Sequence, residues 1–137
     1  MLSLDMLEKG PGPLLEFLPE PDAQALAEAL VAFANTDGGT IVVGWSPKGE
    51  PTEAWLEEDL EAALTAAQEV CRPPIRAEWR PFEVQGRRGV AIVVARSPEL
   101  HSLADGRVLV RAGAENRPLG GQEIRQLAAT KGTGDFE

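Results

Sequence analysis

The sequence has one cysteine, one histidine and no tyrosine among its 137 residues. A single cysteine, Cys71, excludes an internal disulfide, and a single histidine, His101, leaves no cysteine–histidine cluster that could hold zinc. The apolar runs are too short to span a bilayer, and no basic start followed by an apolar run marks a secretory signal. These absences predict a cytoplasmic protein that needs no membrane, metal or cofactor.

Basic residues are scarce in the first half of the chain. Residues 1–70 carry 2 basic and 14 acidic side chains, residues 71–137 carry 11 basic and 8 acidic ones, and the net charge is −9. An acidic protein repels polyanions at long range, but the second half leaves room for a local basic face. Both a functional asymmetry and an ordinary solvated surface produce such segregation. Most of the basic residues are arginine and the loops are rich in proline, which indicates a thermophilic source or a GC-rich genome.

The hydrophobic pattern predicts one domain over residues 1–137, with a core over about 14–130 and flexible ends. Glycines and prolines at 10–13 argue against a helix across residues 1–21. Asp22 is a typical helix N-cap, and the apolar run at 40–45 is typical of a central strand. Helices are expected at 22–35, 53–71 and 121–130, and strands at 14–17, 40–45, 75–84, 90–95 and 107–111. The predicted fold is therefore α/β (α+β), a mixed sheet with about three helices in the order β-α-β-α-β-β-β-α.

Familiar catalytic motifs are missing from the sequence. Neither a phosphate-binding Gly-x-x-x-x-Gly-Lys-Ser/Thr loop nor a Gly-x-Gly-x-x-Gly fingerprint occurs. His101 is interpreted as a surface loop residue, and neither Ser97 nor Ser102 has an evident triad around it. Cys71 is expected to be a buried structural thiol.

Two strings stand out from this background. The first, residues 32–44 (Ala-Phe-Ala-Asn-Thr-Asp-Gly-Gly-Thr-Ile-Val-Val-Gly), joins a helix to a buried strand. Turn chemistry alone explains its glycines, but it explains the whole string less well. The second, residues 110–118 (Val-Arg-Ala-Gly-Ala-Glu-Asn-Arg-Pro), places two arginines around a glycine turn. Those arginines either meet a phosphate or are solvated side chains of a strand-turn-helix connection.

In this order, the two strings resemble the Schlafen/AlbA-type DNA-binding domain family. That family has Glu-Phe-Lys near its start, Ala-Phe-Ala-Asn-Thr-x-Gly-Gly before a strand ending in Ile-Gly, and Val-Arg-x-Gly-Ser/Thr before a closing helix. Here Glu16-Phe17, residues 32–44, and residues 107–113 with Arg117 match these parts, over roughly residues 14–127. The resemblance implies a mixed α/β fold and a nucleic-acid-related role, as in bacterial domains that head transcriptional regulators. The motif residues are Asn35, Thr36, Asp37, Gly38, Gly39, Gly44 and Gly113.

Some Schlafen proteins are ribonucleases with an acidic triad, and the resemblance shows where its acids would lie. This chain has Pro11 where the first acid belongs, Leu18 in place of the lysine, and Trp45-Ser46-Pro47 where an acidic pair would follow the Ile-Gly strand. Only Glu16 of the triad remains, and one carboxylate binds a divalent cation weakly. A degenerate metal-dependent ribonuclease using Glu16, with Asp37 or Glu8, stays as the alternative to a non-catalytic domain.

We therefore predict a stand-alone nucleic-acid-binding domain without catalysis, for DNA more than RNA, related to transcriptional regulators. A homodimer is expected because Schlafen proteins pair two such lobes in one chain, whereas this chain has one. A protein-interaction module that has lost nucleic-acid binding is the remaining alternative. Phosphate contacts are expected from Arg111, Arg117, Arg87 and Arg88, and then from Arg72 and Arg76.

Overall fold

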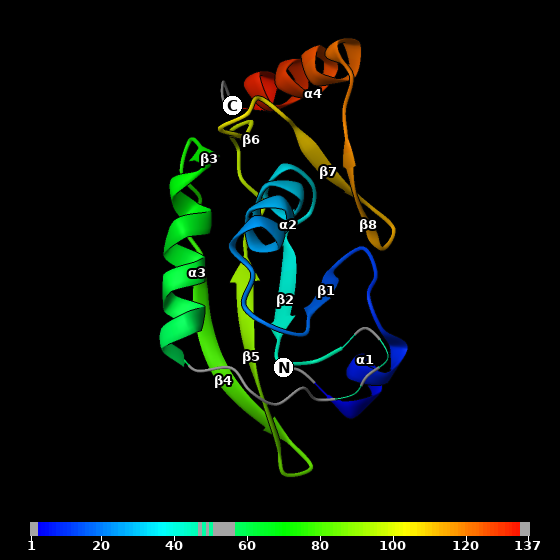
Figure 1. Ribbon diagram of the computed structural model, residues 1–137. Helices are drawn as coiled ribbons and strands as arrows, with labels where there is room; N and C mark the ends of the chain where they lie inside the picture. The colour runs from blue at the N-terminus through cyan, green and yellow to red at the C-terminus, as the bar shows by residue number, and fades with distance from the viewer. Residues whose placement is uncertain (1–2, 47, 49, 51–56, 135–137) are drawn as a thin grey trace.

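The computed structural model describes residues 3–46, 48, 50 and 57–134 (Figure 1). Its helices are α1 (Leu4–Lys9), α2 (Ala23–Asn35), α3 (Glu57–Glu69) and α4 (Gly121–Gly134). Its strands are β1 (Leu15–Leu18), β2 (Gly39–Val43), β3 (Cys71–Arg72), β4 (Glu78–Val84), β5 (Arg87–Val94), β6 (Ser102–Leu103), β7 (Leu109–Ala112) and β8 (Glu115–Pro118). The predicted mixed α+β fold is confirmed, with four helices in the described residues rather than about three.

The main sheet has the strand order β1-β2-β5-β4. β1 and β2 are parallel, as the intervening helix α2 requires, since parallel neighbours need a crossover connection. β2 pairs antiparallel with β5, and β5 with β4. The run predicted to be a central strand is indeed central: Ile41, Val42 and Val43 are all fully buried. Two further pairs, β3 with β6 and β7 with β8, lie outside this sheet.

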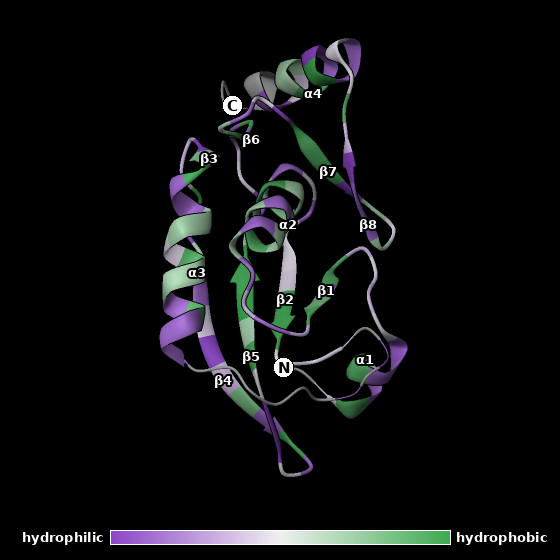
Figure 2. Ribbon diagram, in the orientation of Figure 1, coloured by the Kyte–Doolittle hydropathy of each residue, from purple (hydrophilic) through white to green (hydrophobic). Residues whose placement is uncertain are grey.

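The two faces of the sheet have separate cores because side chains alternate along each strand. Ile41 and Val43 of β2 face the larger core, which also contains the apolar side of α2 and Leu60 and Leu64 of α3. Val42 faces the opposite way and packs in a smaller core with Phe17, Trp45 and other residues. Figure 2 shows apolar residues concentrated in β1, β2 and β5, whereas polar and apolar residues are mixed along β4 and α3.

The N-terminal segment differs from the prediction. α1 spans Leu4–Lys9. Its N-cap is Ser3, whose side chain accepts a hydrogen bond from the Met6 N–H, and its C-cap is Gly10. The glycines and prolines at 10–13 therefore follow a helix instead of preventing one. Leu7 stabilises this short helix because its side chain is completely buried in the smaller core.

α2 begins and ends where the sequence predicts. The Asp22 carboxylate accepts hydrogen bonds from the N–H groups of Gln24 at 2.9 Å and Ala25 at 3.2 Å, which caps the first turn. The helix ends at Asn35, and Gly38, with a φ of 77°, turns the chain into β2. For α3, the predicted residues 53–56 lie outside the described part of the chain.

The end of the chain is more elaborate than the predicted strand-turn-helix connection. β7 pairs with β8 in a hairpin around Gly113, whose φ is 60°. β8 is not predicted from the sequence because its residues, Glu-Asn-Arg-Pro, show no apolar pattern. None of the four is buried in the structure. The last helix extends to Gly134, four residues beyond its predicted end. No helix in the described ranges is long and apolar enough to cross a membrane.

Candidate functional site

The string at residues 32–39 lies at the end of α2 and holds two later segments of the chain. The Asn35 side chain, which is buried, donates from Nδ2 to the carbonyls of His101 and Leu109, both at 2.9 Å. Its Oδ1 accepts the His101 N–H at 2.9 Å, and the Ala34 carbonyl accepts the Ser97 N–H at 2.9 Å. Asn35 thus joins α2 to the loop after β5 and to β7.

Thr36, Gly38 and Gly39 extend this junction. The Thr36 Oγ1 donates to the Ala32 carbonyl at 2.7 Å and accepts the Arg111 N–H at 2.9 Å. A Cβ atom on Gly38 would lie 2.7 Å from the Val94 carbonyl oxygen, and one on Gly39 would lie 2.5 Å from the Phe33 ring. Both positions therefore require glycine, because side-chain atoms cannot approach so closely.

The remaining motif residues have different surroundings. Asp37 is exposed. Gly44 has a φ of 91° at the end of β2, and its N–H donates to the Leu18 carbonyl at 2.9 Å. Gly113 forms the β7–β8 turn in open space, since an added Cβ would have no atom within 4 Å. The motif is mainly an internal junction, and Asp37 is its exposed carboxylate.

Arg111 lies in this junction and not on the surface. Its side chain is 0% exposed and forms an ion pair with Glu16, with Nη1 2.8 Å from Oε2. The same guanidinium donates to the Asn116 side chain and to the carbonyls of Gly12 and Leu15, at 2.8 to 3.0 Å. It also lies 5.0 Å from the centre of the Phe33 ring. This geometry does not favour the predicted contact of Arg111 with a phosphate, because Nε, Nη1 and Nη2 each donate to a group inside the protein.

The same pair changes the interpretation of Glu16. Its Oε2 binds Arg111, and its Oε1 accepts the Phe17 N–H at 3.0 Å. The other two candidate acids, Glu8 and Asp37, are exposed. Across the described ranges, no group of three His, Cys, Asp or Glu side chains is placed to hold a metal ion. The ribonuclease alternative therefore gains no support from the geometry of these acids.

The other predicted phosphate contacts divide into arginines that have partners inside the protein and exposed arginines whose side chains have none among the described residues. Arg88 pairs with Glu57 at 2.9 Å and Arg117 with Glu123 at 3.3 Å, all with exposed side chains. The pKa of Glu123 is lowered, first by the Gly120 N–H and then by Arg117. Arg72 donates to backbone carbonyls at the end of α3. Among the residues that the structure describes, five exposed arginines have side chains without a hydrogen-bond or ion-pair partner: Arg76, Arg80, Arg87, Arg96 and Arg125.

Four of these five arginines belong to one segment, residues 76–96, which we call the basic hairpin. It contains β4, β5, five arginines and two glutamates, a balance of +3 that equals the whole surplus of residues 71–137. Its turn, with Gln85 at a φ of 52° and Gly86 at 76°, projects away from the rest of the chain at the end opposite α4 (Figure 1). Phosphate contacts are predicted from the sequence for Arg76, Arg87 and Arg88 but not for Arg80 and Arg96. For Arg80, its place on the polar side of the alternating strand β4 is the available signal, whereas Arg96 lies beyond the end of β5.

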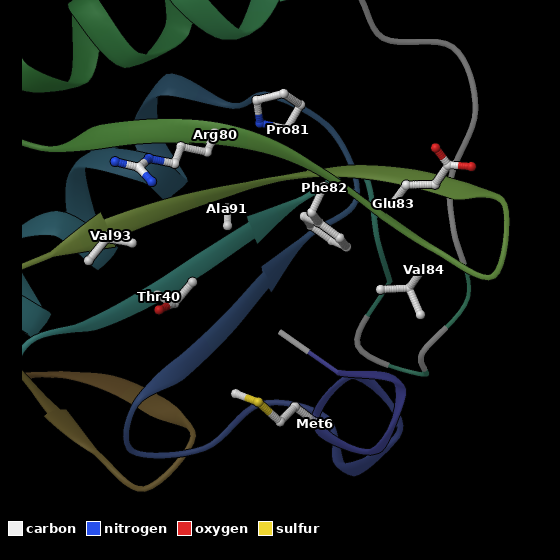
Figure 3. A pocket seen from close by; sticks show the side chains of 9 residues that line it. All are labelled: Met6, Thr40, Arg80, Pro81, Phe82, Glu83, Val84, Ala91 and Val93. Carbon is white, nitrogen blue, oxygen red and sulfur yellow. The ribbon is translucent and has the colours of Figure 1, made fainter. Parts of the chain in front are cut away.

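Beside the basic hairpin, the sheet face opposite α2 and α3 has a groove of about 480 Å³ (Figure 3). Thr40, Ala91 and Val93 form its floor, and Val93 is 58% exposed. Figure 3 shows the Arg80 side chain on one side of this groove and Phe82 further along the same strand. The groove therefore combines the Arg80 guanidinium, the Thr40 hydroxyl and an apolar surface.

His101 corrects a second prediction. It is 3% exposed and not a surface residue. Its Nδ1 lies 2.8 Å from the Pro73 carbonyl oxygen and its Nε2 lies 2.7 Å from the Ser97 Oγ. A serine and a histidine are thus hydrogen-bonded, although no triad is evident from the sequence. A spacing of four residues within a loop carries no signal for such a contact.

The architecture defines an α+β domain in which a buried arginine–carboxylate pair and an asparagine junction connect the two ends of the chain. The family model described as Schlafen, AlbA_2 matches residues 15–120. The chain therefore belongs to this family, as the motif resemblance predicted. A comparison with curated proteins finds no match.

A solved structure is similar to this fold. It is the crystal structure of the DIP2311 protein from Corynebacterium diphtheriae, with a TM-score of 0.64 and 22% sequence identity. The similarity covers 83% of this chain but only 26% of that protein. At this identity, the likeness supports the fold alone.

Proposed function

We propose that the protein is a nucleic-acid-binding domain that contacts phosphates through the basic hairpin. The observation that carries this proposal is the concentration of unpartnered arginines on residues 76–96 of a chain whose net charge is −9. Local positive charge attracts a polyanion at short range even when the whole protein is acidic, because salt screens distant charges beyond roughly 10 Å. Membership of the Schlafen, AlbA_2 family supports the same role.

The shape of the hairpin supports double-stranded DNA as the ligand. A two-stranded β-ribbon fits the major groove, and residues 82–89 form one, because β2 pairs with β5 only at residues 90–94; Arg87 and Arg88 follow the turn of this ribbon. Arg80 lies further along β4, opposite Ala91, where β2 also joins the sheet, so a further cation lies beyond the base of the ribbon. The ion pair with Glu57 does not prevent Arg88 from contacting a phosphate, because exposed ion pairs contribute only about 0–1 kcal/mol.

The test compares two triple variants of equal charge. Arg80→Ala, Arg87→Ala and Arg88→Ala together remove three cations from the basic hairpin. Arg107→Ala, Arg117→Ala and Arg125→Ala together remove three from the other end of the chain. Binding to a 20-base-pair duplex is measured by fluorescence anisotropy over a range of salt concentrations. We expect the hairpin variant to bind at least about tenfold more weakly, and its log K versus log salt slope to fall by about 0.9 for each lost phosphate contact.

The control variant should keep the affinity within about twofold. Equal losses in both variants would mean that net charge and not the hairpin determines binding, which contradicts the assignment of the surface. Single-stranded DNA and RNA of the same length, run in parallel, test the preference for duplex DNA. Absence of binding to all three ligands by the wild-type protein would favour the protein-interaction alternative. Sedimentation of the free protein and the complex tests the predicted homodimer.

A further inference from the structure

Ser97 and His101 are hydrogen-bonded in the arrangement of an activated nucleophile and its base. The Pro73 carbonyl can only accept, so the His101 Nδ1, 2.8 Å away, carries the ring proton. In the neutral imidazole with this tautomer, Nε2 is the acceptor for the Ser97 hydroxyl, whose Oγ lies 2.7 Å away. A nucleophile, a base and a third group that orients the base form the arrangement that activates serine in hydrolases.

The rest of the structure holds this geometry in place. His101 is fixed through its backbone, because Asn35 binds both its N–H and its carbonyl. Ser97 is fixed by its N–H on the Ala34 carbonyl and by its own carbonyl, which accepts from Lys131 Nζ at 2.6 Å. The Glu99 N–H donates to the Ser97 Oγ at 3.1 Å, which leaves the hydroxyl proton directed at the histidine.

Ser97 and His101 both line a hollow of about 240 Å³. Arg76 and Arg96 line the same hollow, and neither has a side-chain partner among the described residues. Glu99 also lines it, so these three charged side chains sum to +1. A volume below the roughly 300 Å³ of the smallest drug-sized sites suits a short acyl chain, and the charge suits an anionic one.

We propose that Ser97 is a catalytic nucleophile, with His101 as its base, for short carboxylic esters whose acyl group bears a carboxylate. His101 Nε2 takes the hydroxyl proton as the Ser97 Oγ forms a bond to the ester carbon. The bond from that carbon to the alcohol oxygen then breaks, and Nε2 gives its proton to the leaving alcohol. Water attacks the acyl-serine, Nε2 takes the proton of that water and returns it to Ser97, and the free acid leaves. Arg76 and Arg96 bind the acyl carboxylate.

This activity does not rest on nucleic-acid binding, although Arg76 and Arg96 also belong to the basic hairpin, and the first experiment tests the nucleophile alone. The intact protein is treated with a fluorophosphonate, and the modified peptide is identified by mass spectrometry. We expect a single adduct on Ser97, no adduct in Ser97→Ala, and unchanged labelling in Ser102→Ala, which is the matched control. His101→Gln, checked for folding by circular dichroism, should label at least about 10²-fold more slowly. Absence of an adduct on wild-type Ser97 under a large excess of reagent overturns the proposal whatever the variants do.

The second experiment tests the substrate class with two 4-nitrophenyl esters of similar acyl length, the anionic succinate monoester and the neutral butyrate. We expect hydrolysis that depends on Ser97 and a higher kcat/KM for the succinate ester. Arg76→Ala with Arg96→Ala should remove that preference while leaving fluorophosphonate labelling of Ser97 in place. An equal rate for the two esters in the wild-type protein would overturn the assignment of an anionic acyl group. Hydrolysis of both at the same rate by Ser97→Ala would overturn the nucleophile.

Discussion

The Arg111 guanidinium lies 2.8 Å from the Glu16 carboxylate, with the arginine side chain completely buried and that of Glu16 17% exposed. These two residues are 95 positions apart, and they belong to the two outer parts of the family motif. Arg111 also donates to the carbonyls of Gly12 and Leu15 beside β1. The pair therefore attaches the β7–β8 hairpin to the edge of the main sheet.

Removing Arg111 should destabilise the protein strongly. In Arg111→Ala, Glu16 and two carbonyls each lose one of their hydrogen-bond partners, and breaking a buried ion pair in this way costs about 3–5 kcal/mol. Arg111→Lys should recover only a small part of this loss, since an ammonium group cannot reproduce the several directions of the guanidinium fork. Urea unfolding followed by circular dichroism measures both variants. Arg117→Ala is the control and should change the free energy of unfolding by less than about 1 kcal/mol, because its ion pair is exposed. A similar small loss in Arg111→Ala would contradict this role.

Asn35→Ala should also lower the free energy of unfolding, by at least about 3 kcal/mol. The substitution leaves three buried backbone groups without partners, two on His101 and one on Leu109, and each costs about 1–3 kcal/mol. Thr36→Val is a useful comparison because it keeps the side-chain volume and removes two bonds, to the Ala32 carbonyl and the Arg111 N–H. It should cost less than Asn35→Ala. Hydrogen exchange adds a local test: the His101 amide should lose protection in Asn35→Ala, and continued protection would contradict the junction.

The sequence predicts the local part of this junction well. The N-cap at Asp22, the end of α2 at Asn35 and the glycine turn into β2 depend on capping and backbone preferences, which act between neighbouring residues. The central position of β2 also follows from its apolar run. Asn35, however, has its partners 66 and 74 residues away, and no local pattern encodes them.

Arg111 and His101 show why the site was harder to predict. An arginine beside a glycine turn is equally compatible with an exposed phosphate contact and with a buried ion pair, and the packing of β7 against α2 decides between them. His101 was interpreted from its loop sequence as exposed, but Asn35 and Pro73 hold it inside. The family motif contains the residues that form the junction, but their partners follow from long-range contacts that no local pattern encodes.

Cys71 should be unreactive in the folded protein. Burial raises the pKa of its thiol to about 11 from an ordinary value of 9.0. A thiol-reactive dye should therefore label Cys71 at pH 8 only at the rate of unfolding, and labelling should accelerate with added urea. Because the unfolded thiol loses its proton near pH 9 and the folded one near pH 11, the free energy of unfolding should fall as pH rises between these values. Cys71→Ala should show a smaller fall over this range. Rapid labelling without urea would contradict the burial of the thiol.

Gly38→Ala and Gly86→Ala separate backbone strain from close packing. The two glycines have nearly the same φ, 77° and 76°, so alanine suffers similar strain at each, about 1–2 kcal/mol. At Gly86 the added Cβ meets no atom within 4 Å, whereas at Gly38 it lies 2.7 Å from the Val94 carbonyl oxygen. Gly38→Ala should therefore cost about 1–3 kcal/mol more than Gly86→Ala in urea unfolding. The Ser97 loop follows directly after this contact, so Gly38→Ala should also slow fluorophosphonate labelling of Ser97, while Gly86→Ala should leave it unchanged. Equal unfolding free energies for the two variants would show that the motif glycine serves only the turn and not the approach of α2 to β5.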